Sequence, residues 1–160
     1  MTQLRTPKVI VIDDDPAVRN VIVAAFNRVG CETRWAVDGR SGVRLFNAEP
    51  AHLVVTDIVM PNQEGIETIM QLKRRERPPK VIAISGGGRR GGQDFLVWAS
   101  HLGADATLPK PFRTSQLIEV ARGLLERRGP PAGPGPFDRP APFEQEDGFG
   151  RERFQSERAA

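Results

Sequence analysis

Short apolar segments of this chain alternate with longer segments whose apolar residues recur at helical spacing. Short Val- and Ile-rich runs are typical of strands that are buried on both faces, and a spacing of three and four residues is typical of helices. The pattern predicts strands at residues 8–12, 32–37, 53–56, 81–84 and 106–108, and helices at residues 16–29, 41–47, 63–75, 93–102 and 115–127. This alternation predicts an α/β fold with a five-stranded parallel sheet and helices on both of its faces.

The first predicted helix has recognisable signals at both ends. Asp15 stands at an N-cap position, and Pro16 occupies the first helical position, where a missing N–H costs nothing. Gly30 follows the last apolar residue of the pattern and is expected to end the helix. Cys31 comes next and is predicted to be a small core residue.

The last 32 residues differ sharply in composition from the rest of the chain. Residues 129–160 contain five Gly and six Pro but no Ile, Leu, Val, Met or Trp, so they cannot bury enough apolar surface to offset the entropy of ordering. We expect an N-terminal extension at residues 1–6, one folded domain at residues 7–128 and a disordered tail at residues 129–160. The tail carries Phe at positions 137, 143, 149 and 154, which suits either a solubilising end or a binding strip with aromatic anchors.

Composition also narrows the compartment and the class of partner. The longest apolar runs span four to six residues, too short for a membrane span, and no signal-peptide core follows Met1. With Cys31 as the single cysteine, no internal disulfide is possible, which favours a reducing compartment, the cytoplasm. The basic run at residues 73–77 is interpreted as a solvated helix end, so neither a membrane nor a nucleic acid is an expected partner.

Charged and hydroxyl side chains follow the predicted strands where each strand ends. Asp13, Asp14 and Asp15 follow the first strand, and the third, fourth and fifth strands lead to Asp57, Ser85 and Lys110. The carboxyl ends of parallel strands meet at one edge of a sheet. Carboxylates about 4 Å apart repel each other by roughly 4 kcal/mol per pair at an effective dielectric constant near 20, so such a cluster needs a cation or a retained proton. Oxygen ligands suit Mg²⁺, and a lysine and a hydroxyl opposite them suit a phosphoryl group.

Four motifs, in this order and spacing, resemble the receiver domain of two-component response regulators from about Pro7 to Arg128. They are residues 9–16 (VIVIDDDP), residues 57–61 (DIVMP) with Gly65, the strand that ends at Ser85, and residues 110–112 (KPF). The resemblance implies a flavodoxin-like fold with strand order 2-1-3-4-5.

The resemblance also implies a role for each residue of the metal site. Asp57 would be the phosphoacceptor and a ligand of Mg²⁺ or Mn²⁺. Asp14 would bind the metal directly, Asp13 mainly through water, and the backbone carbonyl of Val59 would complete the protein ligands.

The residues that bind the transferred phosphoryl group follow from the same resemblance. Ser85 would hydrogen-bond a phosphoryl oxygen, and Lys110 would pair with the phosphoryl group. A cis peptide is implied between Lys110 and Pro111, which agrees with proline being the usual site of cis bonds.

Two features of this chain depart from the family pattern. Thr107 occupies the position where receivers usually carry an aromatic residue that turns inward on activation. A glycine-rich segment that starts with Gly86, Gly87 and Gly88 follows the Ser85 strand and makes the stretch before Lys110 longer than expected. We therefore expect ordering of this loop, rather than rotation of an aromatic side chain, to transmit the signal.

The resulting prediction is a stand-alone receiver that acts as a phosphorylation switch and not as an enzyme with an external substrate. It would accept its phosphoryl group on Asp57 from a histidine kinase or phosphotransfer protein and would dephosphorylate itself. Its downstream partner would bind the surface of the fourth helix and fifth strand, which includes Trp98, or the Phe-containing tail. The alternatives are a phosphate sink, a receiver fragment of a longer regulator and, from a different class, a phosphohydrolase of the haloacid-dehalogenase type that uses Asp13 as its nucleophile.

Overall fold

The computed structural model describes residues 6–60, 65–86 and 92–126, and for residues 92–96 it describes only the backbone. Strands and helices alternate without exception along these residues. The strands are β1 (Lys8–Ile12), β2 (Glu32–Ala36), β3 (Leu53–Asp57), β4 (Lys80–Gly86) and β5 (Ala106–Lys110). The helices are α1 (Pro16–Arg28), α2 (Gly39–Ala48), α3 (Gly65–Lys73), α4 (Gly92–His101) and α5 (Thr114–Glu126).

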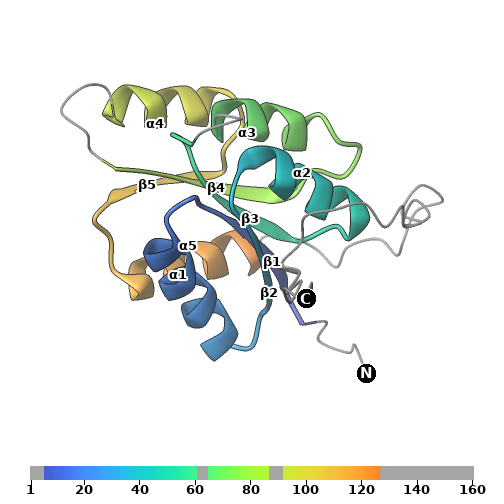
Figure 1. Cartoon of the computed structure of the whole chain (residues 1–160), viewed down its shortest axis with the longest axis vertical. Coiled ribbons are helices and arrows are strands. Elements are labelled where there is room, and N and C mark those ends of the chain that lie inside the picture. The colour runs from blue at the N-terminus through green and yellow to red at the C-terminus, as the bar shows by residue number, and fades with distance from the viewer. Residues whose placement is uncertain (1–5, 61–64, 87–91, 127–160) are drawn as a thin grey trace, which may run out of the picture.

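The strands form one parallel sheet in the order β2-β1-β3-β4-β5. Helices α1 and α5 cover one face of this sheet, and α2, α3 and α4 cover the other (Figure 1). The predicted fold class, strand order and two-sided helical cover are therefore confirmed.

The core consists of two apolar layers separated by the sheet. Side chains alternate along β1, so that Ile10 and Ile12 face α2, α3 and α4, whereas Val9 and Val11 face α1 and α5. All four side chains are at most 1% exposed. Burial on both faces explains why the strands consist of continuous Val and Ile runs instead of alternating apolar and polar residues.

Three strands continue beyond the apolar runs that predicted them. In the structure β3 includes Asp57, β4 extends to Gly86 and β5 extends to Lys110. Their backbones stay paired, with Asp57 opposite Ile84 and Gly86 opposite Lys110. Because strand pairing uses backbone groups, it continues past the last apolar side chain and carries polar residues to the sheet edge.

The expected ends of α1 are confirmed, but the prediction for Cys31 is wrong. The Asp15 side chain accepts hydrogen bonds from the backbone N–H groups of Ala17 and Val18, and Pro16 begins the helix. Gly30 follows with φ of 85°, a conformation that favours glycine. Cys31 is only half-buried and lies at the margin of the α1–α5 layer.

The basic run that begins with Lys73, the last residue of α3, is only partly solvated. Arg74, Arg75 and Arg77 are exposed, as predicted, but Lys73 is half-buried and its ammonium group contacts Asp105 before β5. In the part of the chain that the structure describes, no helix combines the length and the apolar character needed to cross a membrane.

Candidate functional site

Three carboxylates converge at the carboxyl ends of β1 and β3, as the sequence predicts. Asp13 and Asp14 directly follow β1, and Asp57 is the last residue of the neighbouring β3. One carboxylate oxygen from each residue lies within 4.8 Å of the others. Asp13 is fully buried, Asp57 is 6% exposed, and Asp14 faces solvent. The cluster therefore has two buried members and one accessible member.

Lys110 brings a positive charge from the end of β5 to the two buried carboxylates. Its Nζ donates hydrogen bonds to Oδ2 of Asp57 at 2.7 Å and to Oδ2 of Asp13 at 3.2 Å. Burial by itself would lower the pKa of Lys110, but the hydrogen bonds and negative charges of Asp57 and Asp13 outweigh it and raise the pKa. The lysine is therefore held in its charged form, which is the form that can pair with an anion.

Asp13 is the most constrained member of the cluster. Its Oδ1 accepts a hydrogen bond from the Asp15 backbone N–H at 2.9 Å, and its own N–H donates to the Ala36 carbonyl at 3.2 Å. Burial raises the pKa of the Asp13 carboxyl, and the Asp57 charge acts in the same direction, while the Asp15 N–H and Lys110 act against them. The negative charge of ionised Asp13 is thus only partly compensated by the surrounding protein groups, so a bound cation would stabilise it further.

The β3–α3 connection holds Asp57 at the sheet edge. Its Oδ1 accepts a hydrogen bond from the Val59 backbone N–H at 3.0 Å, and its carbonyl accepts one from the Thr56 hydroxyl at 2.9 Å. Gly65, the first residue of α3, approaches so closely that an added Cβ would lie 2.1 Å from the Asp57 carbonyl oxygen. Glycine at this position is therefore required by the packing of α3 against the end of β3.

The predicted phosphoryl-binding and switch residues lie on the neighbouring strands. Ser85 is 2% exposed, one position beyond the residue of β4 that pairs with Asp57, and its hydroxyl makes a long hydrogen bond of 3.4 Å to the Gly86 carbonyl. Thr107 is half-buried in β5, opposite Ala83. Gly86 ends β4, whereas Gly87 and Gly88 lie outside the described residues.

The donor set of the cluster fits a hard divalent cation. Three carboxylates against one lysine give a local charge of −2 if all four groups are ionised. All the side-chain ligands are oxygens, which suits Mg²⁺ or Mn²⁺ better than a soft metal. Asp13, Asp14 and Asp57 are the side chains that could hold such an ion.

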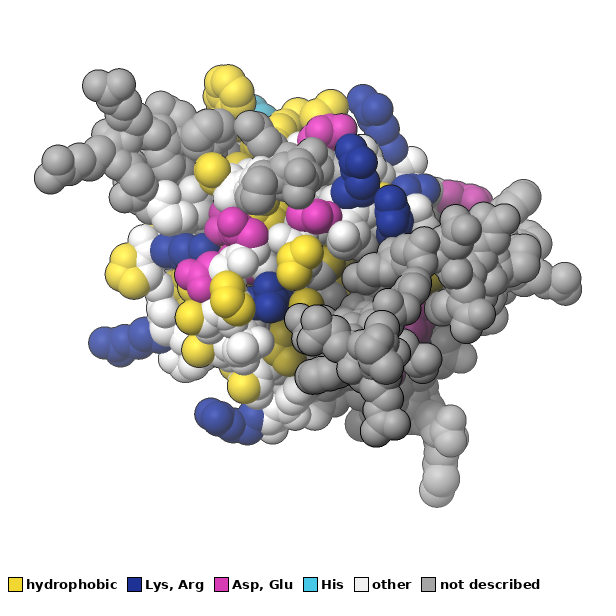
Figure 2. Space-filling view, viewed as in Figure 1, with side chains coloured by type: hydrophobic (Ala, Val, Ile, Leu, Met, Phe, Trp, Pro, Cys, Tyr) yellow, Lys and Arg dark blue, Asp and Glu magenta, His cyan; other side chains and the backbone are white. Residues whose placement is uncertain are grey.

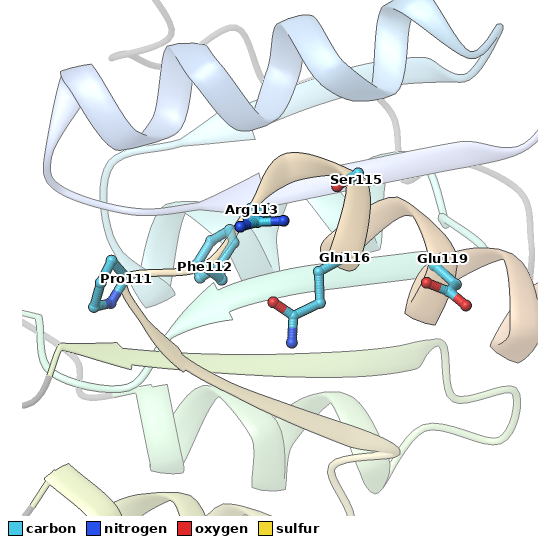
Figure 3. A pocket seen from close by; sticks show the side chains of 6 residues that line it. All are labelled: Pro111, Phe112, Arg113, Ser115, Gln116 and Glu119. Carbon is cyan, nitrogen blue, oxygen red and sulfur yellow. The ribbon is translucent and has the colours of Figure 1, made fainter.

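A separate hollow begins directly after Lys110 in the chain. It has a volume of about 570 Å³ and is lined by Pro111, Phe112, Arg113, Ser115, Gln116 and Glu119, from the β5–α5 connection and the first turns of α5 (Figure 3). The peptide bond between Lys110 and Pro111 is cis. None of the three clustered carboxylates lines the hollow, so the acidic site is a feature of the sheet edge and not of this cavity.

Sequence reasoning missed one residue that touches the site. Arg19 in α1 is 8% exposed, and its Nη1 donates a hydrogen bond of 3.0 Å to the Asp13 carbonyl oxygen. The available signal was an arginine between the apolar residues Val18 and Ile22 of the helix, where a solvated side chain would not be expected. Net charge gave no such indication, because it does not distinguish a buried arginine from the acidic and basic side chains that lie together on the face shown in Figure 2.

Comparison with known proteins identifies related chains. The family model for the response regulator receiver domain matches residues 9–122. The chain is 32% identical over 127 residues to the DNA-binding transcriptional regulator NtrC of Azospirillum brasilense, a match that covers 78% of this chain and 25% of that protein. It is 31% identical over 128 residues to the response regulator MprA of Mycolicibacterium vanbaalenii, covering 80% of this chain and 54% of that protein. The chain thus spans between a quarter and about half of the length of these relatives.

Solved structures show the same relationship. The receiver domain of NtrX from Brucella abortus has a TM-score of 0.69 and 30% identity, over 75% of this chain and 99% of that one. The receiver domain of the Francisella response regulator 1452 has the same TM-score and identity, over 76% of this chain and 98% of that one. These receiver domains are matched over nearly their whole length, and the family model covers more than half of this chain. The chain belongs to the receiver-domain family of bacterial two-component response regulators, whose general function is that of a phosphorylation switch.

Proposed function

We propose that this chain is switched by transfer of a phosphoryl group to Asp57. The observation that carries the proposal is the position of the Asp57 carboxylate, which is hydrogen-bonded to Lys110 and lies within 4.8 Å of oxygens of Asp13 and Asp14. An anion that arrives at Asp57 therefore meets a lysine on one side and carboxylates able to hold a cation on the other. This combination stabilises a phosphoryl group without any further nucleophile or base.

Mg²⁺, or Mn²⁺ in its place, is the cation that the site would hold. Asp13, Asp14 and Asp57 would supply the side-chain oxygens, and the backbone carbonyl of Val59, whose own N–H is hydrogen-bonded to Asp57, is the proposed additional ligand. When bound, the metal supplies positive charge next to the phosphoryl oxygens. The exposed Asp14 is the natural direct ligand, whereas Asp13 is buried and already engaged by Lys110, which suits contact through water.

The transfer itself needs few groups from the protein. An oxygen of the Asp57 carboxylate forms the new bond to phosphorus while the bond from phosphorus to the donor breaks, and the donor leaves with its electron pair. Lys110 then pairs with a phosphoryl oxygen instead of the ionised carboxylate. Ser85, on the strand next to β3, is the proposed hydrogen-bond donor to another phosphoryl oxygen.

The donor is proposed to be a histidine kinase or a phosphotransfer protein in the cytoplasm. The chain would function as a phosphoacceptor that hydrolyses its own phosphoryl group and not as an enzyme with an external substrate. Output would pass to a protein partner through the α4–β5 surface, where the Val97 and Trp98 side chains are 52% and 60% exposed. Output through a further domain of a longer regulator stays open, because the chain spans at most about half of the relatives described above.

The loop after β4 is proposed to transmit the change. Thr107 lacks the ring that would rotate inward, and Gly86, the last residue of β4, begins a glycine-rich segment of the sequence directly after Ser85. Amide hydrogen exchange of residues 86–92 should slow on phosphorylation. Exchange that is the same in both states would contradict this role for the loop.

Phosphorylation by a small donor tests the central assignment. The full chain is incubated with Mg²⁺ and acetyl phosphate, followed by intact-mass measurement and peptide mapping. One phosphoryl group is expected on Asp57, none in Asp57→Asn, and normal labelling in the control Glu126→Gln, which alters an exposed carboxylate of α5. Labelling at another residue, or no labelling, would overturn the proposal.

The same variants separate the switch from a phosphohydrolase. A hydrolase that uses Asp13 would turn over a small phosphomonoester equally well in the wild type and in Asp57→Asn. A receiver should show no such turnover in either protein.

A further inference from the structure

Arg19 is a buried cation whose role the proposed phosphorylation chemistry does not explain. It lies in α1 with 8% exposure, and no carboxylate among the described residues forms an ion pair with it. Its Nε has no hydrogen-bond partner in this part of the chain. Burial of a guanidinium group without a carboxylate is costly, so the contacts that Arg19 does make deserve a functional explanation.

Two contacts hold the guanidinium group in place. Its Nη1 donates to the Asp13 carbonyl oxygen at 3.0 Å, and its Cζ lies 4.3 Å from the centre of the Trp35 ring on β2. An arginine over the face of a tryptophan is attracted by the ring, and the planar group stacks in a defined orientation. Trp35 is 45% exposed, so it separates Arg19 from solvent on that side without being a core residue itself.

With the hydrogen bond from Arg19, every polar group of Asp13 has a hydrogen-bond partner. The N–H of Asp13 is bonded to Ala36, its Oδ1 to the Asp15 N–H, and its Oδ2 to Lys110. The remaining polar group is the carbonyl, which belongs to the peptide unit joining Asp13 to Asp14. Arg19 therefore fixes the orientation of the peptide that leads to the accessible carboxylate of the cluster.

We propose that Arg19, held by Trp35, is a positioning residue that keeps Asp13 and Asp14 in the arrangement that binds a divalent cation. The inference rests on the cation site of the proposed function, and it adds two residues that contribute no ligand atom. Groups that orient metal ligands commonly change metal affinity by one to two orders of magnitude when removed.

The sign of the effect separates positioning from simple electrostatics. Arg19 carries a positive charge next to an acidic cluster, so its Coulomb interaction with a bound cation is repulsive. Removal of the charge alone would make cation binding tighter. If the main role of Arg19 is to orient the Asp13–Asp14 peptide, its removal makes cation binding weaker instead.

Titration of residues 1–160 with Mn²⁺ tests the inference, with free Mn²⁺ measured by electron paramagnetic resonance. We expect Arg19→Met to raise the Kd for Mn²⁺ about tenfold. Trp35→Leu should raise it about threefold, because Arg19 stays but loses its stacking partner, and Trp35→Phe should restore most of the affinity because it keeps an aromatic face. Since Trp35 is partly exposed, its variants stay informative even if Arg19→Met fails to fold.

Arg34→Met is the matched control. Arg34 lies next to Trp35 on β2, but it points to the other face of the sheet and pairs with Glu49 after α2. Its loss should lower the thermal midpoint and leave the Kd for Mn²⁺ unchanged. An unchanged or tighter Kd in folded Arg19→Met, or in Trp35→Leu if Arg19→Met does not fold, would overturn the inference.

Phosphorylation of the same samples by acetyl phosphate keeps the two proposals distinct. At saturating Mg²⁺, Arg19→Met should reach the wild-type level of Asp57 labelling, but it should need a higher Mg²⁺ concentration to do so. If the wild type binds Mn²⁺ but Asp57 is never labelled, the proposed function fails, and the Kd comparison still decides the role of Arg19. If the wild type binds no Mn²⁺, both proposals fail.

Discussion

Lys110 is the residue that most directly stabilises the acidic site in the absence of a metal. It contacts both buried carboxylates, Asp13 and Asp57, and its side chain is 21% exposed. The raised pKa of Asp13 shows that even with this lysine the ionised carboxylate is incompletely compensated. Lys110 thus only partly compensates the repulsion between Asp13, directly after β1, and Asp57, at the end of β3.

Replacing Lys110 with Met should therefore make the stability of the protein depend on the cation. In EDTA we expect the free energy of unfolding to fall by about 3 kcal/mol, since a buried charge pair loses one partner. A ligand that binds the folded state raises the free energy of unfolding. We expect Mg²⁺ to raise it more in Lys110→Met than in the wild type. Urea unfolding with and without Mg²⁺ measures both quantities. Arg122→Met, which removes an exposed cation of α5, should show neither effect, and an equal Mg²⁺ response in all three proteins would contradict the prediction.

At the scale of elements, the approach of α3 to the end of β3 decides the shape of the site. An added Cβ at Gly65 would meet the backbone of Asp57 at 2.1 Å and that of Ile58 at 2.5 Å, and backbone atoms cannot move aside as the tip of a side chain can. The first residue of α3 and the proposed phosphoacceptor are thus in direct van der Waals contact.

Gly65→Ala should lower the free energy of unfolding by about 3 kcal/mol, because α3 must move away from β3. Gly123 in α5 is the matched control, since nothing lies within 4 Å of the Cβ that Ala would add there. Gly123→Ala should raise the free energy of unfolding by up to about 1 kcal/mol through higher helix propensity. Thermal unfolding of both variants checks the contrast, and equal effects of the two changes would show that the close approach is unimportant.

A second contact between elements lies at the opposite end of the sheet. Asp105, just before β5, accepts a hydrogen bond from the Val81 backbone N–H at 2.8 Å, and its carboxylate pairs with Lys73 of α3 at 2.5 Å and with Lys80 of β4 at 3.4 Å. Burial alone would raise the pKa of Asp105, but these hydrogen bonds and charges lower it below the ordinary 3.8. Asp105 thus joins α3, β4 and the start of β5.

Because the folded-state pKa of Asp105 lies below its unfolded value, ionised Asp105 stabilises the fold above the unfolded pKa. The contribution is lost as pH falls through the folded pKa. Asp105→Asn should therefore lower the free energy of unfolding by about 2 kcal/mol near neutral pH, and the difference from wild type should shrink as pH falls below the ordinary value. Denaturant unfolding across this pH range measures the difference. Glu119→Gln, at an exposed carboxylate, should give a small difference at every pH, and a loss for Asp105→Asn that does not vary with pH would contradict the prediction.

On the scale of the whole molecule, the described residues already form a closed core. The two apolar layers cover both faces of the sheet with side chains from β1 through α5. Residues 129–160 lack Ile, Leu, Val, Met and Trp, so their composition offers these layers little further apolar surface.

Removal of residues 129–160 should therefore change the free energy of unfolding by less than about 1 kcal/mol, with no change in the denaturant m-value. Urea unfolding of the full chain and of residues 1–128 checks this expectation. A larger loss of stability together with a smaller m-value would show that the Phe-containing tail packs on the domain.

Much of the fold and of the candidate site was accessible from the sequence, because both depend on local patterns. Apolar runs such as residues 9–12 mark strands by their side chains, whereas the capping side chain of Asp15 and the missing backbone N–H of Pro16 mark the start of α1. The parallel arrangement then places Asp13, Asp57 and Lys110 at one edge of the sheet, whatever the details of packing. Strand ends were less predictable, since pairing of β3, β4 and β5 continues through polar residues.

The sequence by itself determined the order of the elements and the residue types that meet at the sheet edge, since periodicity and strand polarity are properties of the chain. Only the tertiary structure decided which of these residues are buried and what they contact. Asp13 and Asp14 are adjacent in sequence, yet one is fully buried and the other is exposed, and the buried Arg19 lies between Asp13 and a tryptophan from another strand. Burial and side-chain contact depend on the packing of segments distant in sequence, which no local pattern records.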